Sequence, residues 1–107
     1  MKNLLVFLLP MALLAGCAIR PNAPSVQFNS SKTPAEFADC VYPKWQAIRP
    51  GTQITEHRNL VTLTAPSDVA ADQILEAHKT NTGTQVSLYL RGPIGHSRLQ
   101  KAAHECR

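Results

Sequence analysis

The stretch TPAEFADCVYPKWQAIRPG, residues 33–51, carries the signals of an amphipathic helix with defined ends. Thr33 is a good N-cap residue, Pro34 suits the first helical position, and Glu36 is placed to bond back to the cap. Apolar side chains then recur at helical spacing, at Phe37, Val41, Trp45 and Ile48. Arg49-Pro50-Gly51 is a strong stop signal. The stretch therefore predicts a helix that buries one face.

Pro43 interrupts this helical pattern. A proline inside a helix removes one backbone hydrogen bond and clashes with the carbonyl four residues earlier. We therefore expect either a kink near Tyr42 or a helix that ends and restarts there.

The segments that follow have strand character. Residues 60–65 and 85–91 alternate apolar and polar side chains, and residues 52–58 form a weaker, edge-like strand. In 85–91 the alternation predicts Val86, Leu88 and Leu90 inward and Ser87, Tyr89 and Arg91 outward. Residues 69–79 are helical by propensity, but a turn cluster and a clear strand follow them, which favours a strand over 73–79.

The N-terminus reads MKNLLVFLLPMALLAGC, a positive start and a short apolar run that ends in Cys17. The run is too short to span a bilayer, which requires about 20 residues, and is typical of a secretion signal. Its end, Leu14-Ala15-Gly16-Cys17, resembles the lipobox of bacterial lipoproteins. This resemblance implies cleavage before Cys17, a diacylglycerol on the Cys17 sulfur and an acyl chain, such as palmitate, on its amine. Because Ala18 rather than Asp follows, it also implies the outer membrane, with the protein facing the periplasm.

If Cys17 carries the lipid, two of the three cysteines remain, Cys40 and Cys106. Cys40 borders the apolar face of the first helix. A final helix from about Gly95 places four residues on one face, Leu99, Ala102, Ala103 and Cys106. In an oxidising compartment such a pair most often forms a disulfide. A metal site or reactive thiol is the alternative, and the lack of a C-x-x-C pattern disfavours it.

These elements predict an α+β fold in which two helices pack on one face of a three- or four-stranded antiparallel sheet, joined by one disulfide. Residues 18–32, AIRPNAPSVQFNSSK, show no apolar period and are rich in Pro, Asn and Ser. We interpret them as an extended tether with a reach of roughly 50 Å. The predicted organisation is thus a signal peptide (1–16), a lipidated cysteine with a flexible tether (17–32) and a small periplasmic domain (33–107).

Charge and motifs exclude several functions. Only Lys2 precedes Cys17 among the charged residues, so the net charge falls from +4 to +3 on cleavage. This charge suits anionic head groups or glycans and is too weak to predict nucleic-acid binding. We find no nucleophile elbow, metalloprotease motif or phosphate-binding loop. We therefore expect a non-enzymatic protein without cofactor or metal. His57 and His78 on neighbouring strands are the alternative, as ligands of a metal ion.

Two tyrosines are the best candidates for a binding patch. Tyr42 and Tyr89 fall on outward positions of their elements, and Arg91 lies near Tyr89 in sequence. Tyrosine and arginine are enriched where binding energy concentrates in protein interfaces. We therefore regard Tyr42, Tyr89 and Arg91 as candidate binding residues.

The overall pattern of lipobox, tether, a helix with Cys and Trp, paired strands and a terminal Cys resembles small uncharacterised lipoproteins of Gram-negative bacteria and their prophages. The resemblance implies no activity. It leaves two functions open. One is a non-catalytic accessory or binding module of the envelope, with an envelope protein or glycan as partner. The other is a protective lipoprotein that excludes superinfecting phage or inhibits a periplasmic or host hydrolase.

Overall fold

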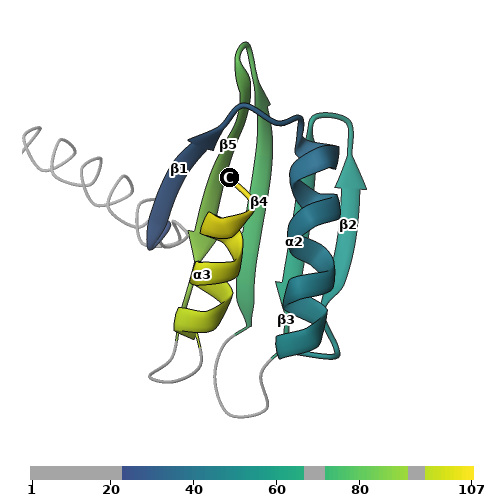
Figure 1. Ribbon diagram of the computed structural model, residues 1–107, viewed down its shortest axis with the longest axis vertical. Coiled ribbons are helices and arrows are strands. Elements are labelled where there is room, and N and C mark those ends of the chain that lie inside the picture. The colour runs from purple at the N-terminus through teal and green to yellow at the C-terminus, as the bar shows by residue number, and fades with distance from the viewer. Residues whose placement is uncertain (1–22, 67–71, 92–95) are drawn as a thin grey trace, which may run out of the picture.

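The computed structural model describes residues 23–66, 72–91 and 96–107. Five antiparallel strands form one sheet in the order β1-β5-β4-β3-β2, and helices α2 and α3 lie side by side on one of its faces (Figure 1). The elements in chain order are β1 (Val26–Ser30), α2 (Pro34–Ile48), β2 (Gln53–His57), β3 (Leu60–Ala65), β4 (Gln73–Thr80), β5 (Gly83–Tyr89) and α3 (His96–Glu105). The predicted α+β fold is confirmed, with five strands instead of three or four.

The additional strand is β1, which corrects the predicted tether. Val26 pairs with Leu88, and Ser30 pairs with Thr84, so residues assigned to a flexible segment form an edge of the sheet. Phe28 is buried in the core, where its ring lies 6.1 Å from that of Phe37. The folded domain therefore begins at or before Val26. The alternation of Val26, Phe28 and Ser30 is too short and too polar to stand out from its Pro- and Asn-rich surroundings.

Helix α2 has the predicted start and continues through Pro43. The Thr33 hydroxyl accepts a hydrogen bond from the Glu36 amide at 3.1 Å, and the Glu36 carboxylate accepts one from the Thr33 amide at 2.9 Å. The alternative of a helix that ends and restarts is wrong, because one helix runs from Pro34 to Ile48. Pro43 is exposed, and so is Asp39 four residues earlier, so water can reach the carbonyl that loses its partner.

The capping box gives a first prediction. Thr33→Ala should lower the free energy of unfolding by about 1 kcal/mol at neutral pH, because it removes the N-cap acceptor. Hydrogen bonds from the Thr33 backbone and side chain hold the pKa of Glu36 below its ordinary value of 4.5. A lowered carboxyl pKa stabilises the fold above the unfolded value, and this contribution is lost as pH falls below it.

Urea unfolding of wild type, Thr33→Ala and Glu36→Gln, at neutral pH and below pH 4.5, measures these effects. The difference between wild type and Glu36→Gln should shrink at the lower pH, whereas Thr33→Ala keeps the backbone N–H that bonds the carboxylate and should show a similar loss at both. A Glu36→Gln difference that is the same at both pH values would contradict a role for the Glu36 carboxylate in the cap.

The order of the central strands follows the sequence closely. Residues 73–80 form a strand, as the turn argument favoured, and pair with β3 and β5. Strand β5 begins and ends two residues earlier than predicted, at Gly83 and Tyr89. Val86 and Leu88 are buried and Leu90 is half-buried, in agreement with their predicted inward direction. The helices cover the side of the sheet that these residues share, and its other side carries the alternate residues of each strand.

Candidate functional site

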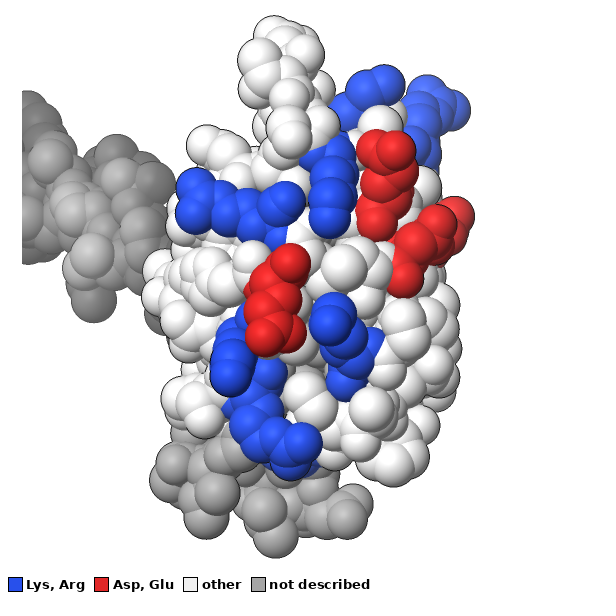
Figure 2. Space-filling model, in the orientation of Figure 1, with Lys and Arg blue, Asp and Glu red and all other residues white. Residues whose placement is uncertain are grey.

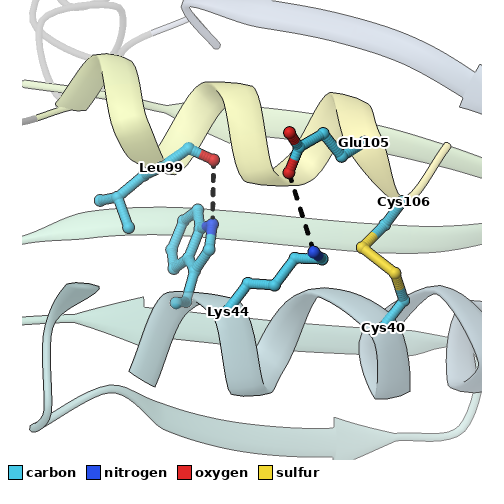
Figure 3. A network of polar contacts seen from close by, with 6 residues as sticks. Cys40, Lys44, Leu99, Glu105 and Cys106 are labelled. Carbon is cyan, nitrogen blue, oxygen red and sulfur yellow. Dashed lines mark hydrogen bonds and ion pairs between the residues drawn. A yellow bond between two sulfur atoms is a disulfide. The ribbon is translucent and has the colours of Figure 1, made fainter. Parts of the chain in front are cut away.

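The predicted disulfide joins the two helices. Cys40 in α2 and Cys106, one residue after α3, are bonded, with their Cα atoms 5.7 Å apart (Figure 3). Cys106 is fully buried and Cys40 half-buried. The bond closes one end of the interface between α2 and α3.

Two further contacts join the helices along their length. The indole Nε1 of Trp45 donates to the Leu99 carbonyl at 3.0 Å, and Trp45 is fully buried (Figure 3). Lys44 Nζ lies 3.8 Å from Glu105 Oε1, with both side chains about half exposed. An exposed pair of this kind contributes little stability. The disulfide and the buried indole therefore set the spacing of the helices, and the ion pair lies on their solvent side.

An open groove of about 360 Å³ lies on this solvent side, between the second half of α2 and α3. Its apolar floor consists of Ala47, Ile48 and Ala102. Lys44, Arg98, Lys101 and Glu105 surround the floor. Ala47 lines it from α2 and Ala102 from α3, so the helix backbones are covered there by little side-chain volume. This accounts for a hollow between helices that are otherwise closely tied.

The charge around the groove is predominantly positive. Three cationic side chains surround it with one carboxylate, and Glu105 is paired with Lys44. Within the described ranges, neither Arg98 nor Lys101 has an acidic group at ion-pair distance. Figure 2 shows basic side chains gathered over the helix face, with few acidic ones among them. The groove thus combines an apolar floor with two cations that have no acidic partner in the described residues.

The structure does not unite the predicted binding residues. Tyr42 is half-buried against the core on the helix side, and its hydroxyl lies 3.5 Å from the Thr52 carbonyl oxygen. Tyr89 follows the buried Leu88 in β5, so it lies on the opposite side of the sheet. The backbone of Arg91 exchanges two hydrogen bonds with the buried Gln73 side chain. Tyr42 is thus only partly exposed, and the three residues form no single patch.

Tyr89 instead belongs to a polar cluster on the uncovered side of the sheet. Its hydroxyl is hydrogen-bonded to Glu76, and His78 Nε2 lies 3.3 Å from Glu76 Oε1. Partial burial raises the pKa of Tyr89 above 10.0, and the adjacent Glu76 carboxylate adds to this shift. The Tyr89 hydroxyl, protonated at neutral pH in any case, therefore keeps its proton to a higher pH than an ordinary tyrosine and donates to Glu76.

The histidines lie apart. His57 is on β2 and His78 on β4, with Leu60 of β3 between them in the register. Within residues 23–66, 72–91 and 96–107, no three His, Cys, Asp or Glu residues are grouped so as to hold a metal ion. His104 stacks on Phe28, with ring centroids 4.6 Å apart, which gives it a packing role.

A second hollow of about 220 Å³ lies between the start of α2 and the β2–β3 hairpin. Its lining includes Glu56 as well as Arg58 and Lys79, so its charges are mixed. It has two cations and one carboxylate, so its excess of positive charge is smaller than that of the groove between α2 and α3.

Sequence reasoning missed this groove. Taken alone, Arg98 and Lys101 are typical of the solvated face of a helix, and Lys44 carries no signal of its own. The signal was present as two stripes at helical spacing, Lys44-Ala47-Ile48 and Arg98-Lys101-Ala102-Glu105. The two stripes form one groove only if the two helices are neighbours. The predicted disulfide was the only indication of this in the sequence.

Cys17 and the rest of the lipobox lie outside the described residues. Neither helix in the part of the chain that the structure describes is long and apolar enough to cross a membrane. Comparisons with protein-family models, with curated proteins and with solved structures find no match to this chain.

Proposed function

We propose that the chain is a lipoprotein of the Gram-negative cell envelope. It is anchored by a lipid on Cys17 to the outer membrane, faces the periplasm, and acts as a non-catalytic accessory or binding module. Its partner in this proposal is an envelope protein or glycan.

The observation that carries the proposal is the pairing of the cysteines. The Cys40–Cys106 disulfide uses two of the three cysteines and is typical of an oxidising compartment. The remaining one, Cys17, follows Leu14-Ala15-Gly16 at the end of a short apolar segment. A lone thiol in a secreted chain needs an explanation, and acylation at a lipobox supplies one.

The start of the folded domain adds a physical constraint. Because β1 begins at Val26, only nine peptide steps separate it from Cys17. At about 3.3 Å per residue the connection spans at most roughly 30 Å, less than the tether predicted from sequence. A domain held this closely acts at the membrane surface, in agreement with an accessory role.

The sheet also offers an edge to a partner. Strand β2 is the last strand on its side of the sheet, and four of its five residues are exposed. The β1 edge is partly occupied, because Arg107 Nε donates to the Asn29 carbonyl at 2.9 Å. An extended segment of another protein binds most simply to an unoccupied edge strand. The β2 edge therefore supports a binding module.

The anchor gives a second prediction. Cys17→Ala in a Gram-negative host should abolish incorporation of labelled palmitate and leave the chain unprocessed or outside the outer-membrane fraction. The reason is that a lipid anchor depends on this sulfur, whereas the disulfide of the domain joins Cys40 and Cys106. Fractionation, palmitate labelling and the mass of the purified protein measure the result. Continued outer-membrane fractionation of Cys17→Ala would contradict the anchor.

The partner is tested by photo-crosslinking in cells. A photoreactive side chain at Thr55, exposed on β2, should capture one dominant envelope protein, and the same probe at Gln27 on β1 serves as the matched control. The adduct should disappear when Cys17→Ala is introduced. Capture of only abundant porins at both positions would contradict docking at the β2 edge.

A further inference from the structure

We propose that the groove between α2 and α3 docks on the phosphate groups of anionic lipids in the membrane that carries the anchor. This inference rests on the lipid anchor proposed for Cys17 and adds an orientation to it. The groove would hold the helix layer of the domain against the bilayer surface.

The chemistry of the groove fits such a surface. Arg98 and Lys101 are exposed, three residues apart on α3, and Lys44 faces them from α2. Arginine and lysine are suited to phosphate oxygens, and anionic leaflets attract clusters of such cations. The floor of Ala47, Ile48 and Ala102 is apolar. A phospholipid carries an anionic phosphate next to its esterified acyl chains. It therefore presents a charged group and an apolar one together.

The position of the groove in the fold also favours a membrane. The chain that would come from the anchor enters at Val26, which pairs with Leu88 near the end of β5. The last turn of α2 and the first turns of α3 lie at this same end of the sheet (Figure 1). A connection of at most roughly 30 Å therefore holds this end, with the groove, nearest the bilayer. The β2–β3 and β4–β5 hairpins lie at the opposite end.

The second hollow shows the contrast. It lies at the hairpin end, and there Glu56 accompanies Arg58 and Lys79. The larger excess of positive charge is thus found at the end of the domain where the anchor would enter, beside an apolar floor.

The test uses the lipidated protein in lipid nanodiscs that contain a trace of head-group nitroxide lipid. One set of discs is phosphatidylcholine, and the other contains phosphatidylglycerol in addition. In the anionic discs the amide signals of Ala47, Ile48 and Ala102 should broaden more than that of Asn81 in the β4–β5 hairpin. In neutral discs this difference should be small, and added salt should reduce it in anionic discs.

Substitutions separate charge from structure. A cation near an anionic surface changes binding by about five-fold, so Arg98→Gln with Lys101→Gln should reduce the ratio of docked to undocked protein about 25-fold. Arg98→Lys with Lys101→Arg should retain docking. Arg58→Gln with Lys79→Gln removes the same charge at the far end and should leave groove broadening unchanged. All four positions are exposed, so folding can be checked for each variant by its unfolding midpoint.

Four results would overturn the proposal. The first two are equal broadening in both disc types and equal docking in both double Gln variants. The third is that inorganic phosphate causes the same amide shifts on neutral discs, and the fourth is broadening that appears only with two copies per disc. The last two would assign the groove to a free anion or to a second copy of the chain. The mass of the intact protein reports acylation separately. An unacylated chain would contradict the anchor, and an acylated chain without selective broadening would contradict the groove alone.

Discussion

Loss of the Cys40–Cys106 bond should lower the free energy of unfolding by roughly 4 kcal/mol. The bond closes a loop with a sequence separation of 66, and the chain-entropy treatment of such a loop gives this value. The free energy of unfolding of a native domain is only about 5–15 kcal/mol, so the reduced protein should be close to marginal stability. A second contact joins the helices farther along their interface, where Trp45 donates to the Leu99 carbonyl (Figure 3).

Cys40→Ala, Cys106→Ala and the double variant are the appropriate changes. Cys106 is fully buried, and a serine there would add the separate cost of a buried hydroxyl. The three variants should lose similar stability, and a reducing agent should destabilise wild type to the same level. Urea unfolding followed by fluorescence of Trp45, the single tryptophan, measures the stability of the three variants and of reduced wild type. Additive losses in the double variant, or a wild type insensitive to reduction, would contradict a shared bond.

The elements that could be predicted from sequence are those with local signals. The N-cap at Thr33, the stripe of Phe37 to Ile48 and the alternation in 60–65 need only nearby residues to be recognised. The disulfide was predictable for another reason, since two independent helical periodicities placed Cys40 and Cys106 at the same interface. Agreement between signals at different levels is what makes a fold predictable.

Strand β1 had no such local signal. Its stability comes from residues more than 50 positions later in the chain: pairing with β5, the stacking of His104 on Phe28, and Arg107 Cζ 5.6 Å from the Phe28 ring centroid. Val26 and Phe28 alone do not define a period. The groove between α2 and α3 was missed for a related reason, because Lys44 and Arg98 become neighbours only when the lateral order of the helices is known. Similarly, Tyr42 and Tyr89 were joined as a patch without knowledge that the sheet separates them.

Because strand β1 was not predicted, the role of Gly83 could not be recognised from the sequence. In the sequence it ends the turn cluster 80–83 and looks like an ordinary turn glycine. In the structure Gly83 has φ +146°, a conformation that other residues rarely adopt. A Cβ at this position would lie 2.2 Å from the Ser30 carbonyl oxygen and 2.9 Å from the Ser31 Cα. Both neighbours are backbone atoms at the end of β1, so neither can move aside as a flexible side chain would.

Gly83→Ala should therefore cost at least about 3 kcal/mol, because the unfavourable φ and the contact with Ser30 add together. The loss should be concentrated in β1, with faster amide exchange at Phe28 than at Leu75 in the centre of the sheet. Gly51→Ala is the matched control. Its Cβ would meet a side-chain atom, Pro66 Cγ, at 3.0 Å, and its φ lies outside the positive region, so the cost should stay below about 1 kcal/mol.

Urea unfolding and hydrogen exchange of the two alanine variants provide the measurement. A Gly83→Ala protein as stable as Gly51→Ala, with Phe28 still protected, would show that β1 does not pack against the β4–β5 hairpin. Selective loss of β1 would have a functional consequence as well. Phe28 supports His104 and Arg107 at the end of α3, so freeing β1 would lengthen the connection from Cys17 and weaken the contacts that hold α3 in place. In that case membrane docking of the groove should weaken in Gly83→Ala although every groove residue is retained.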